Sequence, residues 1–342
     1  MKPWIAVPAT LALVYRAWSR NSLTPLGIFV AALTAVAHAV HPWSVFFALL
    51  VVFFLSGTTV TKVKHDVKAK LTHSSSGSPG GEGPRTHVQV LANSVVASVL
   101  ILAHAWVLKK DGALELCWHN KPYQRAADVL VAGIVANYTA VAADTFSSEL
   151  GILAKAQPRL ITAPWKKVAP GTNGGVTVTG ILAGFLGSFI VAATATALMP
   201  FCEEGSSVLS QDFSSSGWTT HERLNFMLAM TAIGVGGSLF DSLLGAVFQA
   251  SVIDIRTGKV IEGEGGAKVL VRSTGSMKLK QSETAFKDKE HHESRKVATG
   301  MDILSNNGVN LLMAATMSAL AIVGASWLWN LSLSQVLSEL QR

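Results

Sequence analysis

Eight apolar runs divide this sequence of 342 residues, and most charged residues fall between them. The runs lie at about 3–17, 25–40, 43–56, 91–108, 127–143, 174–200, 225–251 and 307–331. Only 14% of the residues are charged, against about 25% in soluble domains. An apolar run of about 20 residues crosses a bilayer as one helix. The pattern therefore predicts an all-α polytopic bundle of eight transmembrane helices, or of seven, since the first and third runs are short.

Basic residues indicate the orientation of this bundle. If the N-terminus lies outside and eight spans alternate, the inside segments are 18–24, 57–90, 144–173 and 252–306. These segments hold most of the 28 Lys and Arg residues, as the positive-inside rule requires. The first run reads as a retained helix, because Arg16 and Arg20 follow it and no small-residue cleavage site does. Nothing marks a chloroplast transit peptide, so we expect the endoplasmic reticulum, with the inside segments in the cytosol.

One transmembrane domain, 1–342, is expected to carry two long cytoplasmic loops. The loop 57–90 begins with the basic stretch TKVKHDVKAK and continues into a Gly/Ser/Pro-rich part that we expect to be disordered. The loop 252–306 contains VIDIRTGKVIE, whose β-branched residues predict a short β-hairpin. A polar insertion follows, and we interpret its His291 and His292 as solvated rather than as metal ligands.

Composition excludes some classes of function. In a membrane protein a net charge of +7 sets topology and attracts anionic lipids or substrates, so it does not indicate a nucleic-acid partner. Two cysteines are too few for the common Cys-rich metal sites. Cys117 and Cys202 both fall in outside loops, where a disulfide is permitted if that side is lumenal. Two unpaired cysteines remain the alternative.

Ionisable residues beside or inside apolar runs are candidates for function, because burying them in a membrane is costly. Asp144 closes the fifth run, and Ser148 shares its helical face. An Asp here has the hard oxygen ligands that Mg²⁺ prefers, or it caps a short helix over 145–153. Asn137 lies two turns earlier on a similar face.

A basic stretch and a glycine turn follow Asp144. Arg159 offers a planar fork for phosphate, and Lys166 and Lys167 offer point charges, although the same residues also suit an anchor at the lipid surface. The turn PGTNGG opens the next apolar run, where backbone N–H groups can face an anion. It lacks the spacing of a Walker A loop, and an ordinary turn is the alternative. The turn residues are Gly171, Thr172, Asn173, Gly174 and Gly175.

Further polar residues approach from the last two apolar runs. Asp241, with Ser238 one turn earlier, lies deep in its run and needs a cation, a lysine or a proton as its partner. Asn306 and Asn310 open the final run, where one of them caps the helix or adds an amide to a site. In the predicted topology all these residues fall near the inner face. Carboxylates together with cationic and N–H donors suit a complex of a metal with a nucleotide or a pyrophosphate.

These segments resemble a known family. ADTFSSELGIL, PRLIT, PGTNGGVTVTG, GSLFDSLLGAVFQ and LSNNGVNLL are similar in order and spacing to the transmembrane protein 19 family of integral membrane proteins, which includes the plant phytyl-phosphate kinase. The resemblance runs from about residue 20 to about residue 335. More distantly, the chain is similar to CDP-diacylglycerol synthases and to CTP-dependent polyprenol and dolichol kinases, in which the acidic position is placed differently. The loop 72–84 and the insertion 276–296 depart from the family outside its motifs.

The resemblance implies a membrane lipid kinase that transfers a phosphoryl group from CTP or another nucleoside triphosphate to an isoprenyl monophosphate. Asp144 and Asp241 would hold Mg²⁺, and with Lys167 they form the expected catalytic set. The expected phosphate and substrate ligands are Arg159, Lys166, Gly171, Thr172, Asn173, Gly174, Gly175, Ser148, Ser238, Asn306 and Asn310. The alternatives are a non-enzymatic transporter or lipid scramblase, and a nucleotidyltransferase acting on phosphatidic acid. The chain length of the acceptor, the choice of nucleotide and a homodimer are left open.

Overall fold

A computed structural model describes residues 1–74, 83–110, 117–120, 125–202, 217–262 and 295–341. The Gly/Ser-rich part of the first long loop, 75–82, lies outside these residues. So does most of the polar insertion, including His291 and His292.

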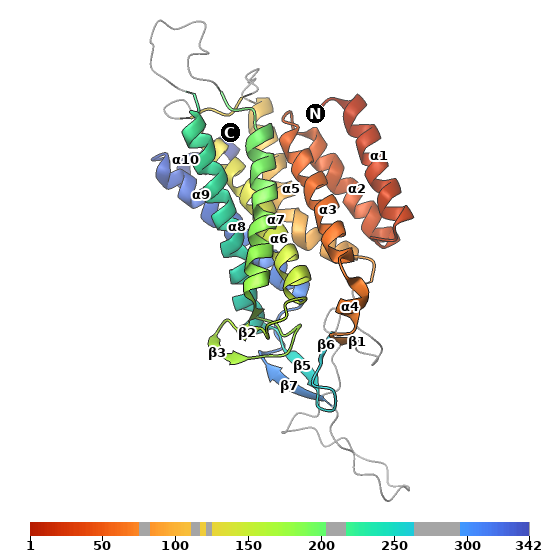
Figure 1. Ribbon diagram of the computed structural model, residues 1–342. Coiled ribbons are helices and arrows are strands. Elements are labelled where there is room, and N and C mark those ends of the chain that lie inside the picture. Colours follow the sequence, from red (N-terminus) through yellow and green to blue (C-terminus); the bar gives the residue numbers. More distant parts are fainter. Residues whose placement is uncertain (75–82, 111–116, 121–124, 203–216, 263–294, 342) are drawn as a thin grey trace, which may run out of the picture.

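The described chain contains eight helices that lie side by side, one for each predicted apolar run (Figure 1). They are α1 (Pro3–Ser19), α2 (Pro25–Val40), α3 (Val45–Lys62), α5 (His87–Lys110), α6 (Val129–Gly151), α7 (Val178–Leu198), α8 (Thr220–Phe248) and α9 (Asn306–Leu328). Six of them, α3 and α5 to α9, are long and apolar enough to cross a membrane, and α2 is a shorter apolar helix. The prediction of a polytopic helical membrane protein is confirmed.

The third run, 43–56, is short for a straight span, and the structure shows that its helix extends into the polar flank that follows. The helix α3 continues through the polar residues of SGTTVTK to Lys62, which the sequence had assigned to a loop. Hydroxyl groups explain the extension: Thr58 bonds to the carbonyl of Phe54, and Thr61 to that of Gly57. These hydroxyl groups therefore find hydrogen-bond acceptors within their own helix and do not require water.

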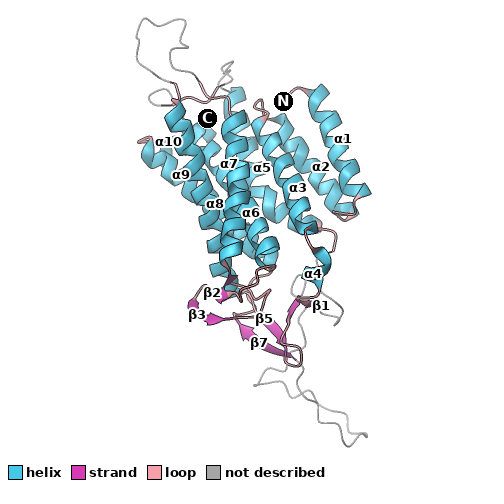
Figure 2. Ribbon diagram, in the orientation of Figure 1, coloured by secondary structure: helices cyan, strands magenta, loops and turns pink. Residues whose placement is uncertain are grey.

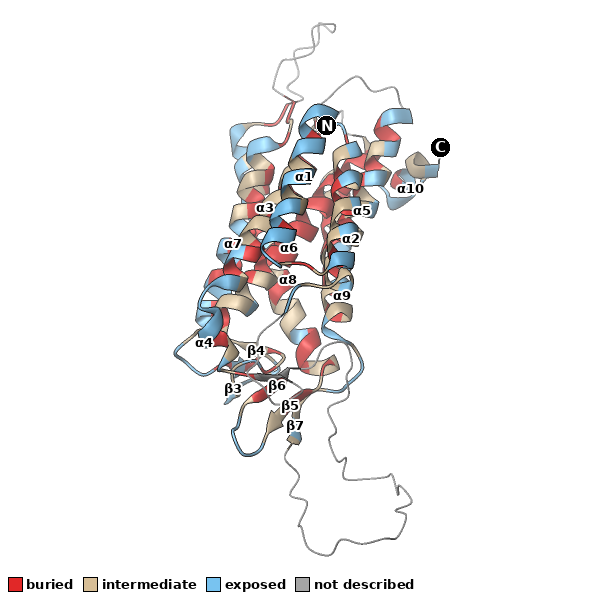
Figure 3. Cartoon of the chain, turned by 90° about the vertical axis from the view of Figure 1, so that its right-hand side faces the viewer, coloured by how far each residue is buried: buried red, intermediate tan, exposed pale blue. Residues whose placement is uncertain are grey.

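The helix α6 forms the centre of the bundle. It packs against α3, α5, α7, α8 and α9, and it is buried over nearly its whole length (Figure 3). Its sequence explains this position, because polar side chains such as Asn137 and Asp144 are costly against lipid and its many small residues let neighbouring helices pack closely.

Glycines bring the neighbouring helices close to α6. A Cβ added at Gly187 of α7 would lie 2.7 Å from the carbonyl oxygen of Ala142. One added at Gly237 of α8 would lie 2.7 Å from the Cβ of Ala140. Small residues allow this backbone approach, which is how membrane helices gain van der Waals contact.

The strands of the described residues all lie at one end of the bundle, which we call the strand end (Figure 2). The predicted hairpin is present as β5 (Ser251–Asp254) and β6 (Val260–Glu262), paired antiparallel. It is enlarged by β1 (His73–Ser74) and β7 (Arg295–Thr299) into a sheet of order β1-β6-β5-β7. A second sheet has the order β3-β2-β4, with β2 (Arg159–Leu160), β3 (Ala163–Lys167) and β4 (Gly175–Val176). Two short helices, α4 (His65–Ala69) and α10 (Leu333–Gln341), complete the fold.

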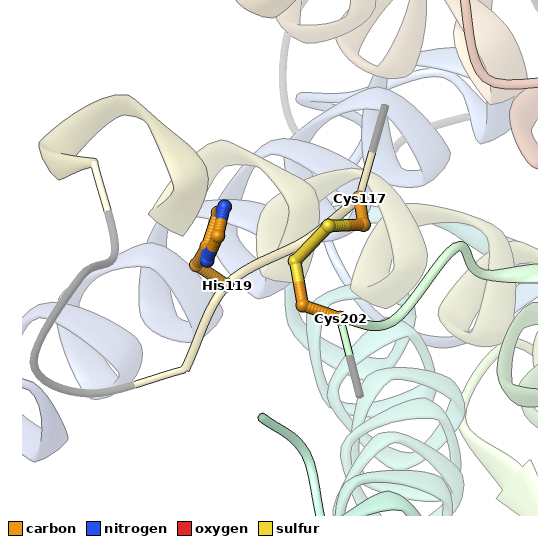
Figure 4. A group of neighbouring side chains, drawn as sticks. All are labelled: Cys117, His119 and Cys202. Atoms are coloured by element: carbon orange, nitrogen blue, oxygen red, sulfur yellow. A yellow bond between two sulfur atoms is a disulfide. The ribbon is translucent and has the colours of Figure 1, made fainter. Parts of the chain in front are cut away.

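The opposite end carries a disulfide between Cys117 and Cys202, and we call it the disulfide end. The two Cα atoms lie 5.0 Å apart, and the bond joins the segments that follow α5 and α7. His119 lies beside it (Figure 4), but the sulfur atoms are bonded to each other and are not thiolate ligands in this state. Of the two alternatives left by the sequence, the structure has the paired cysteines. Trp118 packs there against the rings of Phe201 and Trp218.

Candidate functional site

Asp144 lies inside α6, two turns before this helix ends at Gly151. The alternative that it caps a separate helix over 145–153 is therefore wrong. The helix continues past Asp144 because no proline or glycine interrupts the sequence TFSSEL. Its side chain is half-buried and must face a neighbouring helix.

The neighbour is α8, and the residue that Asp144 meets is Asp241. The contact between Gly237 and Ala140 brings the two helices together, and one turn further along each helix stand Asp241 and Asp144. The two carboxyl groups are close enough to interact electrostatically. Like charges at this distance oppose each other, so the pair requires a proton or a cation. The structure thus brings together the two acidic residues that the sequence singled out.

Asn310 of α9 lies against the same pair. With its amide turned to satisfy its neighbours, its nitrogen donates to Asp241 Oδ2 at 3.3 Å and to the carbonyl oxygen of Asn306 at 3.0 Å. The capping alternative for Asn306 is wrong, because Ser305 is the N-cap and accepts from the N–H of Gly308 at 3.2 Å. Asn306 begins α9 and contributes its backbone to the orientation of Asn310.

Sequence reasoning missed Asn93 of α5. Its side-chain oxygen lies 3.5 Å from the second amide atom of Asn310, and its carbonyl oxygen accepts from Asn137 Nδ2 at 3.2 Å. Asn137 is fully buried, and its Oδ1 has no hydrogen-bond donor among the described residues. The signal for Asn93 was present, since it is an amide inside the apolar run 91–108. The sequence analysis selected the amides of Asn137, Asn306 and Asn310 and omitted this one.

We call these residues the carboxylate cluster: Asp144, Asp241, Asn93, Asn137 and Asn310. Their carboxylate and amide oxygens are the hard donors that Mg²⁺ prefers. Asn137 Oδ1 is a further buried oxygen, with no hydrogen-bond donor among the described residues. The residues present therefore fit the expected Mg²⁺.

The glycine turn, 171–175, packs against the end of α8. A Cβ at Gly174 would lie 2.4 Å from the Cβ of Ala246, and its φ of +75° also favours glycine. The turn therefore requires glycine because of packing and backbone conformation. It lies beside the site, one turn beyond Asp241 on α8.

Most N–H groups of this turn are already used. Those of Thr172 and Gly175 donate to carbonyl oxygens within the turn region, and that of Asn173 donates to Ser251 Oγ at 2.9 Å. For these three residues the expectation of N–H groups aimed at an anion is contradicted, because a bonded donor does not face a ligand. The turn also does not open α7 directly, since β4 and the N-cap Thr177 come between.

The basic residues lie on the second sheet. Arg159 is exposed on β2 and donates to the carbonyl oxygen of Pro164 at 2.8 Å. Lys166 and Lys167 are exposed neighbours on β3, so their side chains leave opposite faces of the strand. Between them and Pro164 stands Trp165, which is 80% exposed. Exposed Trp beside Lys is typical of a lipid interface, so the anchor interpretation gains support.

The two expected serines differ in position. Ser148 is exposed and bonds back to the carbonyl oxygen of Thr145 at 3.2 Å. Ser238 is buried, with 5% of its surface exposed, one turn before Asp241 on α8. Of the two, Ser238 has the more enclosed position. A phosphate-binding role for either stays a prediction.

An ion pair near the strand end was also missed. Lys68 of α4 pairs with Glu149 of α6 and donates to the carbonyl oxygens of Val60 and Thr61. Both charged side chains are largely buried. The pair fixes α4 to the ends of α3 and α6. Its partners are far apart in sequence, so no local pattern revealed it.

Comparisons with known proteins show which family this chain belongs to. The family described as integral membrane protein DUF92 matches residues 8–318. Protein PGR of Arabidopsis thaliana is 33% identical over 324 residues, which cover 95% of this chain and 96% of that protein. A protein of Methanocaldococcus jannaschii described as uncharacterized membrane protein MJ0933 is 36% identical over 117 residues, 34% of this chain and 40% of its own. No solved structure matches. This chain therefore belongs to the DUF92 family of integral membrane proteins.

Proposed function

We propose that this protein is a lipid kinase of the membrane, which transfers a phosphoryl group from a nucleoside triphosphate to an isoprenyl monophosphate. The observation that carries the proposal is the meeting of Asp144 and Asp241 between α6 and α8, with Asn310 against them. Two carboxylates and convergent amides inside a membrane bundle have no packing role. They suit a site that holds a metal ion and the phosphates bound to it.

The reaction needs little covalent chemistry from the protein. An oxygen of the acceptor monophosphate forms a bond to the γ-phosphorus, and the bond from that phosphorus to the β–γ bridging oxygen breaks. The electron pair of the broken bond leaves on the nucleoside diphosphate. The acceptor oxygen is already ionised, so no strong general base is required. Positioning and charge neutralisation are what the site must supply.

The residues have distinct tasks in this proposal. Asp144 and Asp241 hold Mg²⁺, which when bound neutralises charge on the transferring phosphates. Asn310 orients the Asp241 carboxylate through its amide nitrogen. Ser238, Arg159, Lys166 and Lys167 remain candidates for contacts with phosphate. The lysines and Arg159 are exposed at the strand end, where a nucleotide arriving from the aqueous side meets them first.

The test is an assay of the purified protein with Mg²⁺, each nucleoside triphosphate, and isoprenyl phosphates or phosphatidic acid as acceptors. We expect an isoprenyl diphosphate, lost in Asp144→Asn and Asp241→Asn. Asp302→Asn is the matched control, because Asp302 is exposed at the same end of the bundle. A cytidylated lipid made from phosphatidic acid would indicate the nucleotidyltransferase instead. No turnover of any acceptor would overturn the proposal.

One observation favours transport as a second candidate. Polar groups are also buried at the disulfide end, where His41 Nε2 and His104 Nδ1 lie 3.0 Å apart and His104 Nε2 lies 3.2 Å from Asp128 Oδ1. Tyr138 bonds to His38 nearby. Polar residues at several depths are typical of a path through a membrane protein. Flux of an isoprenyl phosphate into liposomes that is lost in His104→Ala, without turnover, would favour this candidate over the kinase.

A further inference from the structure

An apolar pocket opens among α1, α2, α3 and α5, and of the carboxylate cluster it includes Asn93. Its empty space is about 750 Å³, including the part that is open to the surroundings. Apolar side chains from all four helices line most of it, among them Leu13, Ile28, Ala31, Ala35, Leu50 and Phe53. Water would find few hydrogen-bond partners along such a lining, so the pocket suits an apolar chain.

One end of this pocket is polar. Arg85, Gln89 and Asn93 line it there, at the start of α5 and on its first turns. The backbone of Arg85 is fixed, because its N–H donates to Ser22 and its carbonyl oxygen accepts from Thr24, both at 3.0 Å. The pocket thus has an apolar length and a cationic end at a fixed position.

The charge of Arg85 indicates what this end receives. Its Nη2 donates to Thr61 Oγ1 at 3.1 Å, and no carboxylate lies within ion-pair distance of it in the described part of the chain. The Arg85 guanidinium is half-buried beside this apolar pocket, just before α5, so an anion bound there would offset the cost of removing the charge from water. Its planar fork matches the oxygens of a phosphate.

The polar end adjoins the carboxylate cluster in two places. Asn93 belongs to both, since it lines the pocket and approaches Asn310. Gly57 of α3 provides the second link: a Cβ there would lie 3.6 Å from Arg85 Nη1 and 3.8 Å from Thr145 Cγ2. Thr145 follows Asp144 directly. A phosphate held by Arg85 would therefore lie beside the residues proposed to hold the metal.

We propose that this pocket binds the acceptor, with its isoprenyl chain among α1, α2, α3 and α5 and its monophosphate on Arg85. The inference rests on the proposed kinase function and names the binding site for its lipid. The pocket suits an acceptor with an apolar chain and a phosphate, because apolar side chains line most of it and Arg85 is the one cation among its lining residues. Ala31, Ala32 and Ala35 on α2 keep the pocket open, since larger side chains there would fill it.

The test measures binding separately from turnover. Native mass spectrometry of the purified full chain would follow the binding of geranylgeranyl monophosphate, geranylgeraniol and phosphatidic acid. We expect the monophosphate to bind more tightly than the alcohol. Ala32→Trp should fill the pocket and weaken binding of both isoprenyl compounds, whereas Leu33→Trp should not, because Leu33 faces outward with 54% exposure.

Arg85 variants test the phosphate end. Arg85→Gln should weaken binding of the monophosphate by about tenfold to hundredfold and leave the alcohol unchanged. Arg85→Lys should have an intermediate effect, because it keeps the charge and loses the fork. Thermal denaturation midpoints equal to that of the wild type would show that the variants fold.

The outcomes separate this inference from the function it rests on. If the wild type phosphorylates the monophosphate but Ala32→Trp and Arg85→Gln bind it normally, the assignment of the pocket as acceptor site is wrong and the proposed kinase function is retained. If the variants lose binding but the wild type transfers no phosphoryl group, the pocket is retained as a lipid-binding site and the proposed kinase function is wrong. Phosphatidic acid that binds equally well and competes, or no binding of any compound, would overturn the assignment of this pocket.

Discussion

The carboxyl groups of Asp144 and Asp241 meet across the interface of α6 and α8, one helical turn beyond the contact of Ala140 with Gly237. Close backbone packing thus places two like charges together inside the bundle. Such a pair destabilises the fold unless a proton or a cation lies with it. This relationship leads to the first prediction.

Without divalent cations, and at a pH where both carboxyl groups are ionised, Asp241→Asn should raise the thermal denaturation midpoint, because it removes repulsion from Asp144. With Mg²⁺, the wild type should gain stability by binding and the variant should gain little. Titration of Mg²⁺ against the midpoint, in detergent or nanodiscs, checks both signs without any assay of activity. Asp302→Asn serves as the exposed control, with Mg²⁺ raising its midpoint as in the wild type. A variant that is less stable without cations would contradict the repulsion.

Gly237 should be intolerant of a side chain, whereas its neighbour Gly236 should not be. A Cβ at Gly237 would lie 2.7 Å from that of Ala140, while at Gly236 the nearest atom is Met317 Cε at 3.9 Å. Gly237→Ala should therefore cost about 1–3 kcal/mol through overpacking, and Gly236→Ala should be nearly neutral. Reversible denaturation of the two variants measures the difference. Equal stability of both would show that α6 and α8 do not pack as described.

The buried pair of Lys68 with Glu149 should be strongly coupled. Lys68→Met leaves the Glu149 carboxylate without its partner and should cost about 3–5 kcal/mol. Lys70→Met, at an exposed position on the same segment, should cost little. The double variant Lys68→Met with Glu149→Gln should recover part of the loss, because no unpaired charge remains buried. Additive effects in this double-mutant cycle would mean that the two side chains do not interact.

The disulfide should stabilise the disulfide end. It joins residues that are 85 positions apart. In a fully unfolded chain such a link contributes about 4.5 kcal/mol, and helices that persist in the membrane reduce this value. Replacing Cys117 and Cys202 with Ser should lower the thermal midpoint, and a reductant should lower that of the wild type similarly. If the reductant also lowers the midpoint of the double variant, its effect does not act through this bond.

Mild acid should destabilise the fold through His41, in the turn between α2 and α3. The N–H of Trp43 donates to its Nδ1 at 3.0 Å, so its proton sits on Nε2 and faces His104. Burial, and then the neighbouring His104, lowers the pKa of His41 from 6.5 to about 2. Above pH 6.5 His41 is mostly neutral in both the folded and the unfolded protein. As pH falls below about 6.5 only the unfolded state takes up the proton, so this contribution to stability is progressively lost down to about pH 2.

The thermal midpoint should therefore fall between about pH 7.5 and about pH 5. His41→Gln should be less stable at the higher pH, since it alters the buried contact with His104, but its midpoint should depend less on pH. His65→Gln is the control, because His65 is half exposed and pairs only with exposed Asp66. An equal pH dependence in His41→Gln and the wild type would place the acid sensitivity elsewhere.

The sequence predicted most of the secondary structure. Each apolar run became a helix, because an apolar segment in a bilayer must satisfy its backbone within itself. The hairpin at β5 and β6 followed from β-branched residues around Thr257 and Gly258. The end of α3 was missed because its Ser and Thr residues are polar, and polar residues after an apolar run were assigned to a loop. In the structure the hydroxyl groups of Thr58 and Thr61 bond to carbonyl oxygens of their own helix.

The sequence by itself determined which residues are candidates: Asp144 and Asp241 stand out because a charge inside an apolar run is costly wherever the helix lies. Only the tertiary structure decided that these two meet, that Asn93 and Asn137 join them, and that Arg85 ends an apolar pocket beside them. The structure also showed that Gly174 packs against Ala246 of α8, and that the N–H groups of Thr172, Asn173 and Gly175 in the same turn are already bonded. The physical reason is that burial is a property of one segment and its sequence records it. Contact between helices depends on the rotation and depth of both partners, which small residues such as Gly237 set through packing.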